Sequence, residues 1–151
     1  MNVLRTTSKN TDFEALVALL DADLAKRDGQ DHAFYHQFNS IANLKYVVVC
    51  YWEEKPVSCG AFKAFEGNSV EIKRMYTLPE YRGKGCASIV LKALEDWAKE
   101  LGYQSCMLET GKKQPEAIGL YQKNGYVSIE NYGQYKGVEN SLCFQKTLAK
   151  V

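Results

Sequence analysis

The sequence predicts a single α/β domain, in which helices cover a mixed, mostly antiparallel sheet. Segments with apolar residues at helical spacing are interleaved with short β-branched and aromatic segments. No internal repeat, low-complexity segment or linker interrupts the sequence. With 151 residues, the chain is long enough to bury one core. We therefore expect one domain over residues 1–151.

Composition argues against several classes of partner. Lys and Arg total 19 against 18 Asp and Glu, a net charge of +1, so no nucleic acid partner is expected. No apolar run reaches the roughly 18 residues of a membrane span, and Met1–Arg5 lacks the apolar part of a signal peptide. We expect no membrane partner and a cytoplasmic location. The five cysteines have no Cys-x-x-Cys spacing and are expected to be reduced thiols, mostly buried.

The N-terminal elements are a strand over Val3–Thr7 and a helix that follows it. Thr11 and Glu14 have the spacing of a capping box, which predicts the start of the helix, and Gly29 predicts its end. Five apolar side chains fall on one face of this helix: Phe13, Leu16, Val17, Leu20 and Leu24.

A second helix is predicted over residues 31–42. His32 and His36 stand four residues apart within it, a spacing that some zinc sites use. No third ligand is nearby and the glutamate of the zinc protease motif is missing, so we expect no metal site.

Three strands are expected to follow as an antiparallel meander. Tyr46–Trp52, Val57–Phe65 and Val70–Thr77 are rich in β-branched and aromatic residues. Turn residues at Glu53–Pro56 and Glu66–Asn68 separate them.

A glycine-rich turn over Arg82–Ala87 lies between the strand that ends near Thr77 and a helix that runs to about Leu101. Its two glycines permit unusual backbone conformations, and the first N–H groups of the helix have no intrahelical acceptor. Such a turn can bind a phosphate. The helix itself has an apolar face of Val90, Ala93, Leu94, Trp97 and Leu101, with Ser88, Lys92, Glu95, Asp96 and Lys99 on the other face.

Two common phosphate motifs do not fit this turn. Lys84 is followed by Gly85 instead of Ser or Thr, so the Walker A pattern fails. The dinucleotide fingerprint needs a third glycine where Ser88 stands, and it belongs directly after a first strand.

The C-terminal part supplies one more helix between strands. Ser105–Thr110 is predicted as a strand, Pro115 as the first turn of a helix, and Gly125 as the residue that ends it. Tyr126–Glu130 and Ser141–Lys146 are expected to complete the sheet as a final pair.

Three motifs in order resemble the GNAT superfamily of N-acyltransferases. Within it, a small bacterial-type branch is resembled by the segments Glu109–Gly111, Gln114–Ile118, Tyr132–Tyr135 and Cys143–Lys146. Arg82, Gly85 and Ala87 match its pattern Arg/Gln-x-x-Gly-x-Gly/Ala. Glu71–Tyr81 is similar to its central strand and strand exit, and Leu120–Tyr126 to its Leu-Tyr-x-x-x-Gly-Phe/Tyr signature.

The resemblance implies a GNAT-like fold whose central parallel strands, Val70–Thr77 and Ser105–Thr110, splay apart to admit acetyl-CoA as co-substrate. No metal is implied. Backbone N–H groups would bind the thioester and pantetheine at one set of positions and the pyrophosphate at another. The first set is Met75, Tyr76 and Thr77; the second is Arg82, Gly83, Lys84, Gly85, Cys86 and Ala87. Gln114 stands where many relatives have an asparagine that contacts the cofactor.

The resemblance also implies catalytic roles for direct attack of an amine on the thioester in a ternary complex. Glu71 corresponds to the general base of several members, and Tyr121 to the residue that protonates the departing thiolate. Glu109 competes with Glu71, either as the base or as the group that holds a cationic acceptor.

The acceptor is expected to be a small-molecule amine, such as an amino acid or amine metabolite. Tyr132 and Tyr135 precede the final strand, where acceptors of the family often bind. A protein amine as acceptor, a non-catalytic acyl-CoA sensor and a purely structural protein remain alternatives. The sequence does not decide between a monomer and a homodimer.

Overall fold

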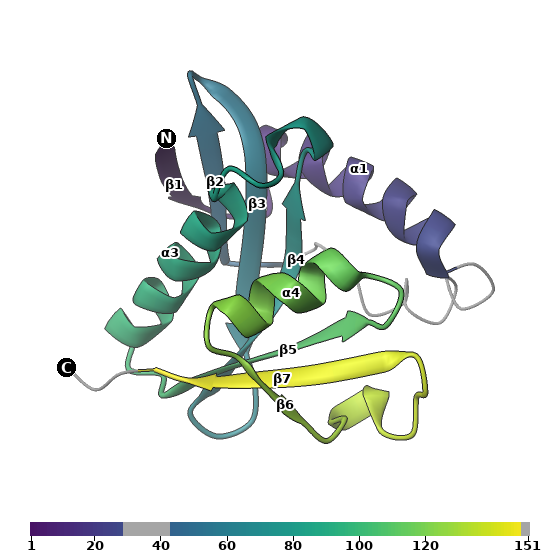
Figure 1. The fold of residues 1–151 in the computed structure, drawn as a ribbon. Helices are drawn as coiled ribbons and strands as arrows, with labels where there is room; N and C mark the ends of the chain where they lie inside the picture. The colour runs from purple at the N-terminus through teal and green to yellow at the C-terminus, as the bar shows by residue number, and fades with distance from the viewer. Residues whose placement is uncertain (29–42, 149–151) are drawn as a thin grey trace.

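The computed structural model of the chain describes residues 1–28 and 43–148. Seven strands form one sheet in the order β1-β2-β3-β4-β5-β7-β6 (Figure 1). Every neighbouring pair is antiparallel except β4 and β5, which are parallel. The strands are β1 Asn2–Thr6, β2 Tyr46–Trp52, β3 Lys55–Ala64, β4 Ser69–Thr77, β5 Ser105–Gly111, β6 Val127–Ile129 and β7 Ser141–Thr147.

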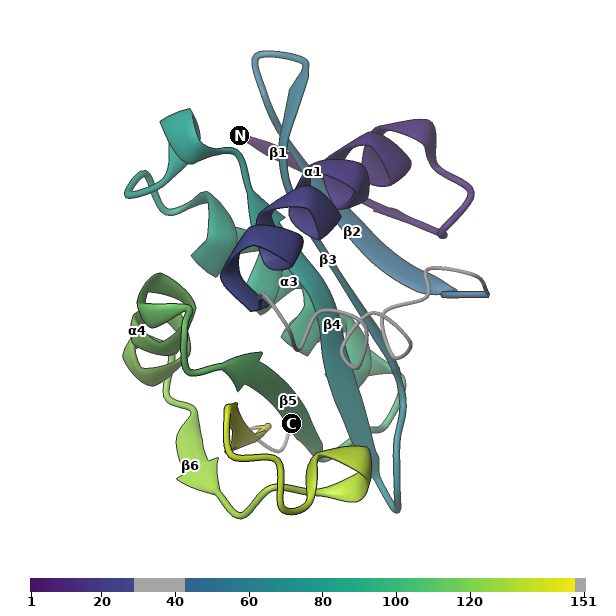
Figure 2. The same cartoon turned by 90° about the vertical axis from the view of Figure 1, so that its right-hand side faces the viewer.

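Helices cover both faces of this sheet. They are α1 Thr11–Asp28, α3 Cys86–Glu100 and α4 Pro115–Lys123, with short 3₁₀ turns at Pro79–Tyr81 and Gly133–Tyr135. Figure 2 shows α1 on one face of the sheet and α3 on the other. The helix predicted over residues 31–42, its two histidines and the predicted stop at Gly29 lie outside the described residues.

The core has two layers because strand β2 is buried on both faces. Val48 and Cys50 pack with α3 and α4, whereas Val47 and Val49 pack with α1. Successive side chains of a strand point to opposite faces, so a strand covered on both sides reads as a continuous apolar run. The predicted single α/β domain with a mostly antiparallel sheet is confirmed.

Helix α1 begins with a different cap from the predicted one. The side-chain oxygen of Asn10 accepts a hydrogen bond from the backbone N–H of Phe13 at 2.9 Å. Asn10 is therefore the N-cap, and the prediction of Thr11 in that role is wrong by one residue. Because both starts give the same periodicity, the predicted face is buried, with Phe13, Leu16, Val17 and Leu20 in the core.

Helix α3 departs from its predicted solvent face at one residue. Glu95, expected to be exposed, is buried and accepts hydrogen bonds from the Tyr126 hydroxyl and the Lys146 ammonium, each at 2.9 Å. Both partners lie far along the chain, in the segment before β6 and on β7. Leu101, expected on the apolar face, is 46% exposed just past the end of the helix.

The parallel strands β4 and β5 pair over only a short stretch. Ser69–Glu71 is in register with Ser105–Met107, and no pairing continues beyond it, although β4 runs to Thr77 and β5 to Gly111. The two strands diverge in both views (Figures 1 and 2). The splay that the resemblance implied is confirmed. Along its second half, the edge of β4 that faces β5 pairs with no strand of residues 1–28 or 43–148.

A β-bulge lies in the half of β4 that pairs with β3 but not with β5. Cys59 pairs with Tyr76 and Ala61 with Lys73, so Arg74 and Met75 together stand opposite the single residue Gly60. Arg74 has a positive φ of 59°, a conformation that costs energy for a residue with a side chain. An extra residue in one strand bends it and redirects the side chains that follow.

Candidate active site

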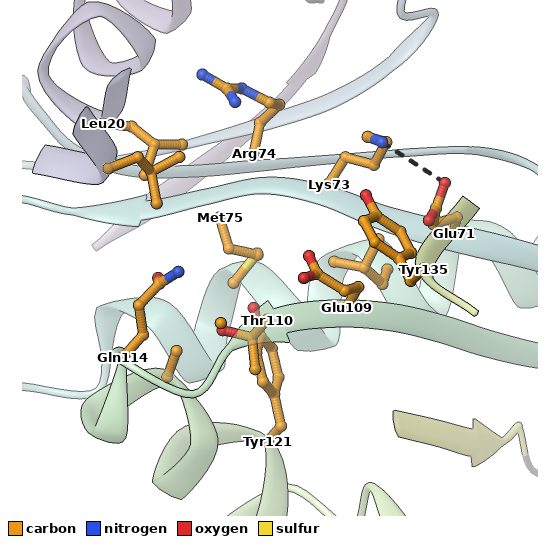
Figure 3. A pocket seen from close by; sticks show the side chains of 14 residues that line it. Leu20, Glu71, Lys73, Arg74, Met75, Glu109, Thr110, Gln114, Tyr121 and Tyr135 are labelled. Atoms are coloured by element: carbon orange, nitrogen blue, oxygen red, sulfur yellow. Dashed lines mark ion pairs between the residues drawn. The ribbon is translucent and has the colours of Figure 1, made fainter. Parts of the chain in front are cut away.

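Two cavities open into the gap between the splayed strands and meet there. One has a volume of about 310 Å³ and the other about 100 Å³. Figure 3 shows the smaller cavity, with Met75 from β4 and Tyr121 from α4 pointing toward its centre. Five residues line both cavities: Leu20, Met75, Gln114, Ala117 and Tyr121.

The larger cavity reaches from this junction to the glycine turn. Gly83 and Gly85 have φ values of 79° and 86°, which favour glycine, and Gly85 is the N-cap of α3. The N-terminal N–H groups of a helix of this length form an anion site together with such a turn. Nine predicted cofactor residues line the cavity: Met75, Tyr76, Thr77, Arg82, Gly83, Gly85, Cys86, Ala87 and Gln114.

The two predicted cations of the turn are placed differently. Arg82 donates from Nε to the carbonyl oxygen of Thr77 at 3.1 Å, and its guanidinium carbon lies 5.7 Å from the ring centre of Tyr76. The Lys84 ammonium lies 5.7 Å from the ring centre of Trp52, and Lys84 does not line the larger cavity. Arg82 is therefore fixed at the cavity wall, while a role for Lys84 in phosphate binding stays a prediction.

Glu71 lies in the smaller cavity with its carboxylate already engaged. It is 2% exposed, and its Oε2 accepts a hydrogen bond from the Tyr132 hydroxyl at 2.8 Å. Its Oε1 lies 3.6 Å from the Lys73 ammonium and 3.9 Å from that of Lys63. The predicted base is thus buried and ion-paired (Figure 3).

Lys73 is a buried cation of this cavity and the one that pairs with Glu71. Its side chain is 6% exposed, and burial lowers its pKa below the ordinary value of 10.5, with Lys63 acting in the same direction. The carboxylates of Glu71 and Glu109 oppose this shift. Burial dominates because the hydration that the ammonium loses outweighs the attraction of the two carboxylates.

Glu109 faces the cavity from β5, on the opposite side of the splay. Its Oε2 accepts a hydrogen bond from the Ser141 hydroxyl at 2.7 Å. Tyr135 lines the same cavity. The ring of Tyr132 packs against the ring of Tyr135, with the ring centres 5.9 Å apart. Of the predicted acceptor residues, Glu109 and Tyr135 therefore line the cavity directly. Tyr132 does not line it but donates a hydrogen bond to Glu71, which does.

Tyr121 stands where the two cavities meet. It is buried, and burial, followed by the charge of Glu109, raises the pKa of its hydroxyl above the ordinary value of 10. The phenol is therefore neutral at physiological pH and carries a proton that it can donate in a hydrogen bond.

Sequence reasoning did not single out Lys73 and Arg74, two buried charged residues of the smaller cavity. The signal was present, because two consecutive cations in a strand predicted to lie inside the sheet are costly to bury unless they have partners. Leu20 and Asp23 of α1 were also missed as cavity walls. Their contribution depends on how α1 crosses the sheet, which no local pattern encodes.

Two further features concern only the described part of the chain. No group of three or more His, Cys, Asp or Glu side chains there has the arrangement of a metal site. No helix there is long and apolar enough to cross a membrane.

Comparison with known proteins identifies the family. The model of the acetyltransferase (GNAT) family matches residues 13–126. The chain is 37% identical over 93 residues to an IAA acetyltransferase of Azospirillum brasilense, which covers 61% of each protein. It is 28% identical over 126 residues to the YyaT protein of Bacillus subtilis, covering 83% of this chain and 82% of that one. The chain thus spans about three fifths of the length of the first of these relatives.

Solved structures agree with this result. An acyl-CoA N-acyltransferase from Klebsiella pneumoniae superposes with a TM-score of 0.82 at 27% identity, covering 98% of this chain and 97% of that one. The PaiA N-acetyltransferase of Thermoplasma acidophilum, solved with coenzyme A, has a TM-score of 0.70 at 16% identity, covering 97% and 99%. Members of the family use acetyl-CoA. The chain, with its splayed strands and glycine turn, belongs to the GNAT acetyltransferase family.

Proposed function

We propose that this protein transfers the acetyl group of acetyl-CoA to a primary amine of a small molecule, with both substrates bound at once. The observation that carries the proposal is the meeting of two cavities at Met75 and Tyr121. One cavity ends at an anion-binding turn, and the other is lined by carboxylates. An amine in the smaller cavity would therefore lie next to a thioester that enters from the larger one.

The glycine turn would hold the pyrophosphate of the co-substrate. Gly83 and Gly85 have the backbone conformation that turns successive N–H groups inward, and the start of α3 adds the positive end of a helix dipole. Arg82 brings a positive charge to the same wall.

The free edge of β4 would bind the pantetheine arm and the thioester. Beyond Glu71 no strand among the described residues pairs with this edge. The N–H groups of the Met75–Thr77 stretch that point away from β3 would therefore be available to a ligand. Donors aimed at the thioester oxygen would stabilise the negative charge that develops there when the amine attacks.

Two carboxylates of the smaller cavity can take the proton of the attacking amine, Glu71 and Glu109. Glu71 is fixed by Tyr132 and Lys73, and Glu109 by Ser141. The charge of Glu109 is felt at Tyr121, which favours Glu109 as the carboxylate nearer the thioester. Comparing Glu71→Gln with Glu109→Gln separates them, because loss of the base lowers kcat by about 10²- to 10⁴-fold and removes the acidic limb of the pH profile.

Tyr121 would stabilise the departing thiolate. A thiol such as that of coenzyme A has a pKa near 8.5, below that of a phenol, so full proton transfer from Tyr121 is unfavourable. Burial raises the phenol pKa further, which favours a hydrogen-bond donor over a proton donor.

Two measurements test the proposal. Calorimetric titration with acetyl-CoA should give saturable binding, and its absence would contradict any role in acyl-CoA chemistry. Release of coenzyme A, followed with a chromogenic disulfide over a panel of amines, then distinguishes an enzyme from a sensor. Binding without turnover of any amine would leave only the sensor function.

A further inference from the structure

The smaller cavity contains a cation with an unused donor. Arg74 lines this cavity, and its side chain is 1% exposed. One of its terminal nitrogens, Nη2, donates to Asp21 of α1 at 2.5 Å. Its Nε is buried and has no hydrogen-bond partner, the one such side-chain nitrogen or oxygen among the described residues. A buried donor without an acceptor is costly, and native proteins rarely leave one.

The backbone holds Arg74 in this position at a cost. Arg74 is the bulged residue of β4, with a positive φ, and Gly60 across the strand pair leaves room for the side chain of Met75 beside it. Figure 3 shows its guanidinium raised from β4 toward Leu20, on the side of the cavity that α1 covers. Strained residues of this kind are concentrated at ligand sites.

The charges that line the cavity are balanced. Two carboxylates, Glu71 and Glu109, and two cations, Lys73 and Arg74, line it. One further charge of each sign pairs with them from outside the lining, Asp21 with Arg74 and Lys63 with Glu71. A purely cationic amine would satisfy the carboxylates but leave the Arg74 donor without an acceptor. A molecule with both an ammonium and an anionic group satisfies both sets.

We propose that the acceptor is a small zwitterionic amine, such as an amino acid, whose carboxylate accepts a hydrogen bond from Nε of Arg74 while its ammonium faces Glu71 and Glu109. This inference rests on the proposed acetyltransferase function. The cavity volume of about 100 Å³ favours a compact acceptor over a long one.

The test compares acceptors with and without this charge, with rates expressed per unprotonated amine because the amide also lowers the pKa of the α-amine. The twenty standard amino acids and their C-terminal amides are offered with acetyl-CoA, and coenzyme A release and the mass of the product are measured. A charge-assisted hydrogen bond corresponds to about a 10- to 100-fold effect, so the best amino acid should exceed its amide by that factor in kcat/KM. If amides are acetylated as well as or better than acids, the zwitterion inference is wrong and the acetyltransferase function stands.

Two variants attribute the preference to Arg74. Arg74→Gln should bring the ratio of acid to amide close to one. Asp21→Asn removes the ion pair but keeps the guanidinium, so it should retain the preference. An unchanged ratio in Arg74→Gln, or an equal loss in Asp21→Asn, would overturn the assignment to Nε. Should Arg74→Gln not fold, the acid-to-amide ratio of the unmodified protein decides.

The same panel separates the two levels of the proposal. If acetyl-CoA binds but neither acids nor amides are acetylated, the proposed acetylation of small amines fails and the inference fails with it. If acetyl-CoA does not bind, the proposed function fails at its first step.

Discussion

Gly60 is the residue whose substitution tests the packing at the β4 bulge most directly. A Cβ at this position would lie 2.4 Å from Sδ of Met75, 2.9 Å from Cδ1 of Leu94 and 3.1 Å from Cγ1 of Val90. Leu94 and Val90 are fully buried in α3 and have little room to move. Overpacking of this kind costs about 1–3 kcal/mol. At roughly 2–4 °C per kcal/mol for a chain of this size, Gly60→Ala should lower Tm by about 2–12 °C in a calorimetric scan.

The cost should depend on Met75, which makes the closest contact. In a Met75→Ala background that contact is absent, so Gly60→Ala should cost at least ~1 kcal/mol less than in the unmodified protein. Gly119→Ala is the matched control, because a Cβ on Gly119 in α4 meets no atom within 4 Å and should stabilise the helix by about 0.5–1 kcal/mol. Equal costs of Gly60→Ala in both backgrounds would refute the assignment of the clash to Met75.

Three further predictions use the same structure. Tyr121→Phe keeps the ring but removes the donor, so kcat should fall ~10²-fold with Tm nearly unchanged; unaltered turnover would remove Tyr121 from the mechanism. Lys146→Met leaves the buried carboxylate of Glu95 without its cation and should lower the free energy of unfolding by ~2–4 kcal/mol. Lys92→Met, which breaks the surface pair with Asp96, should cost less than ~0.5 kcal/mol. Equal losses of the two variants in urea titrations would contradict this. Burial raises the pKa of the Cys59 and Cys106 thiols from 9.0 to about 12. Because the unfolded chain loses these protons first, the free energy of unfolding should fall as pH rises from about 9 to about 12. Neither thiol should react with a chromogenic disulfide at pH 8 before the protein unfolds.

Elements determined by local sequence were predicted well. Strand β2 occupies Tyr46–Trp52 as expected, because its β-branched residues and the turn after it act within a few positions. The turn over Arg82–Ala87 was also found, since glycines followed by an amphipathic helix form a local pattern. The helix cap was placed one residue late because Asn10 and Thr11 are both good caps and only the hydrogen bond decides between them.

Features that depend on distant partners were not predicted. Glu95 looks like a surface residue of a helix until Lys146, 51 positions away, is brought to it by β7. The bulge at Arg74 stands opposite Gly60 on the neighbouring strand, where a side chain would collide with Met75, and no pattern within β4 itself indicates it. The burial of Tyr132 likewise depends on Glu71, 61 positions earlier in the chain.

The bulge explains how one strand serves both ends of the site. Without it, alternation would place Met75 on the same face of β4 as Glu71 and Lys73. The extra residue reverses the alternation, so Tyr76 packs with the α1 layer while Met75 packs with the α3 layer. The charged residues before the bulge therefore line the smaller cavity, and the backbone after it lines the larger one. A single inserted residue thus places the charges expected to bind the acceptor directly beside the edge expected to bind the thioester.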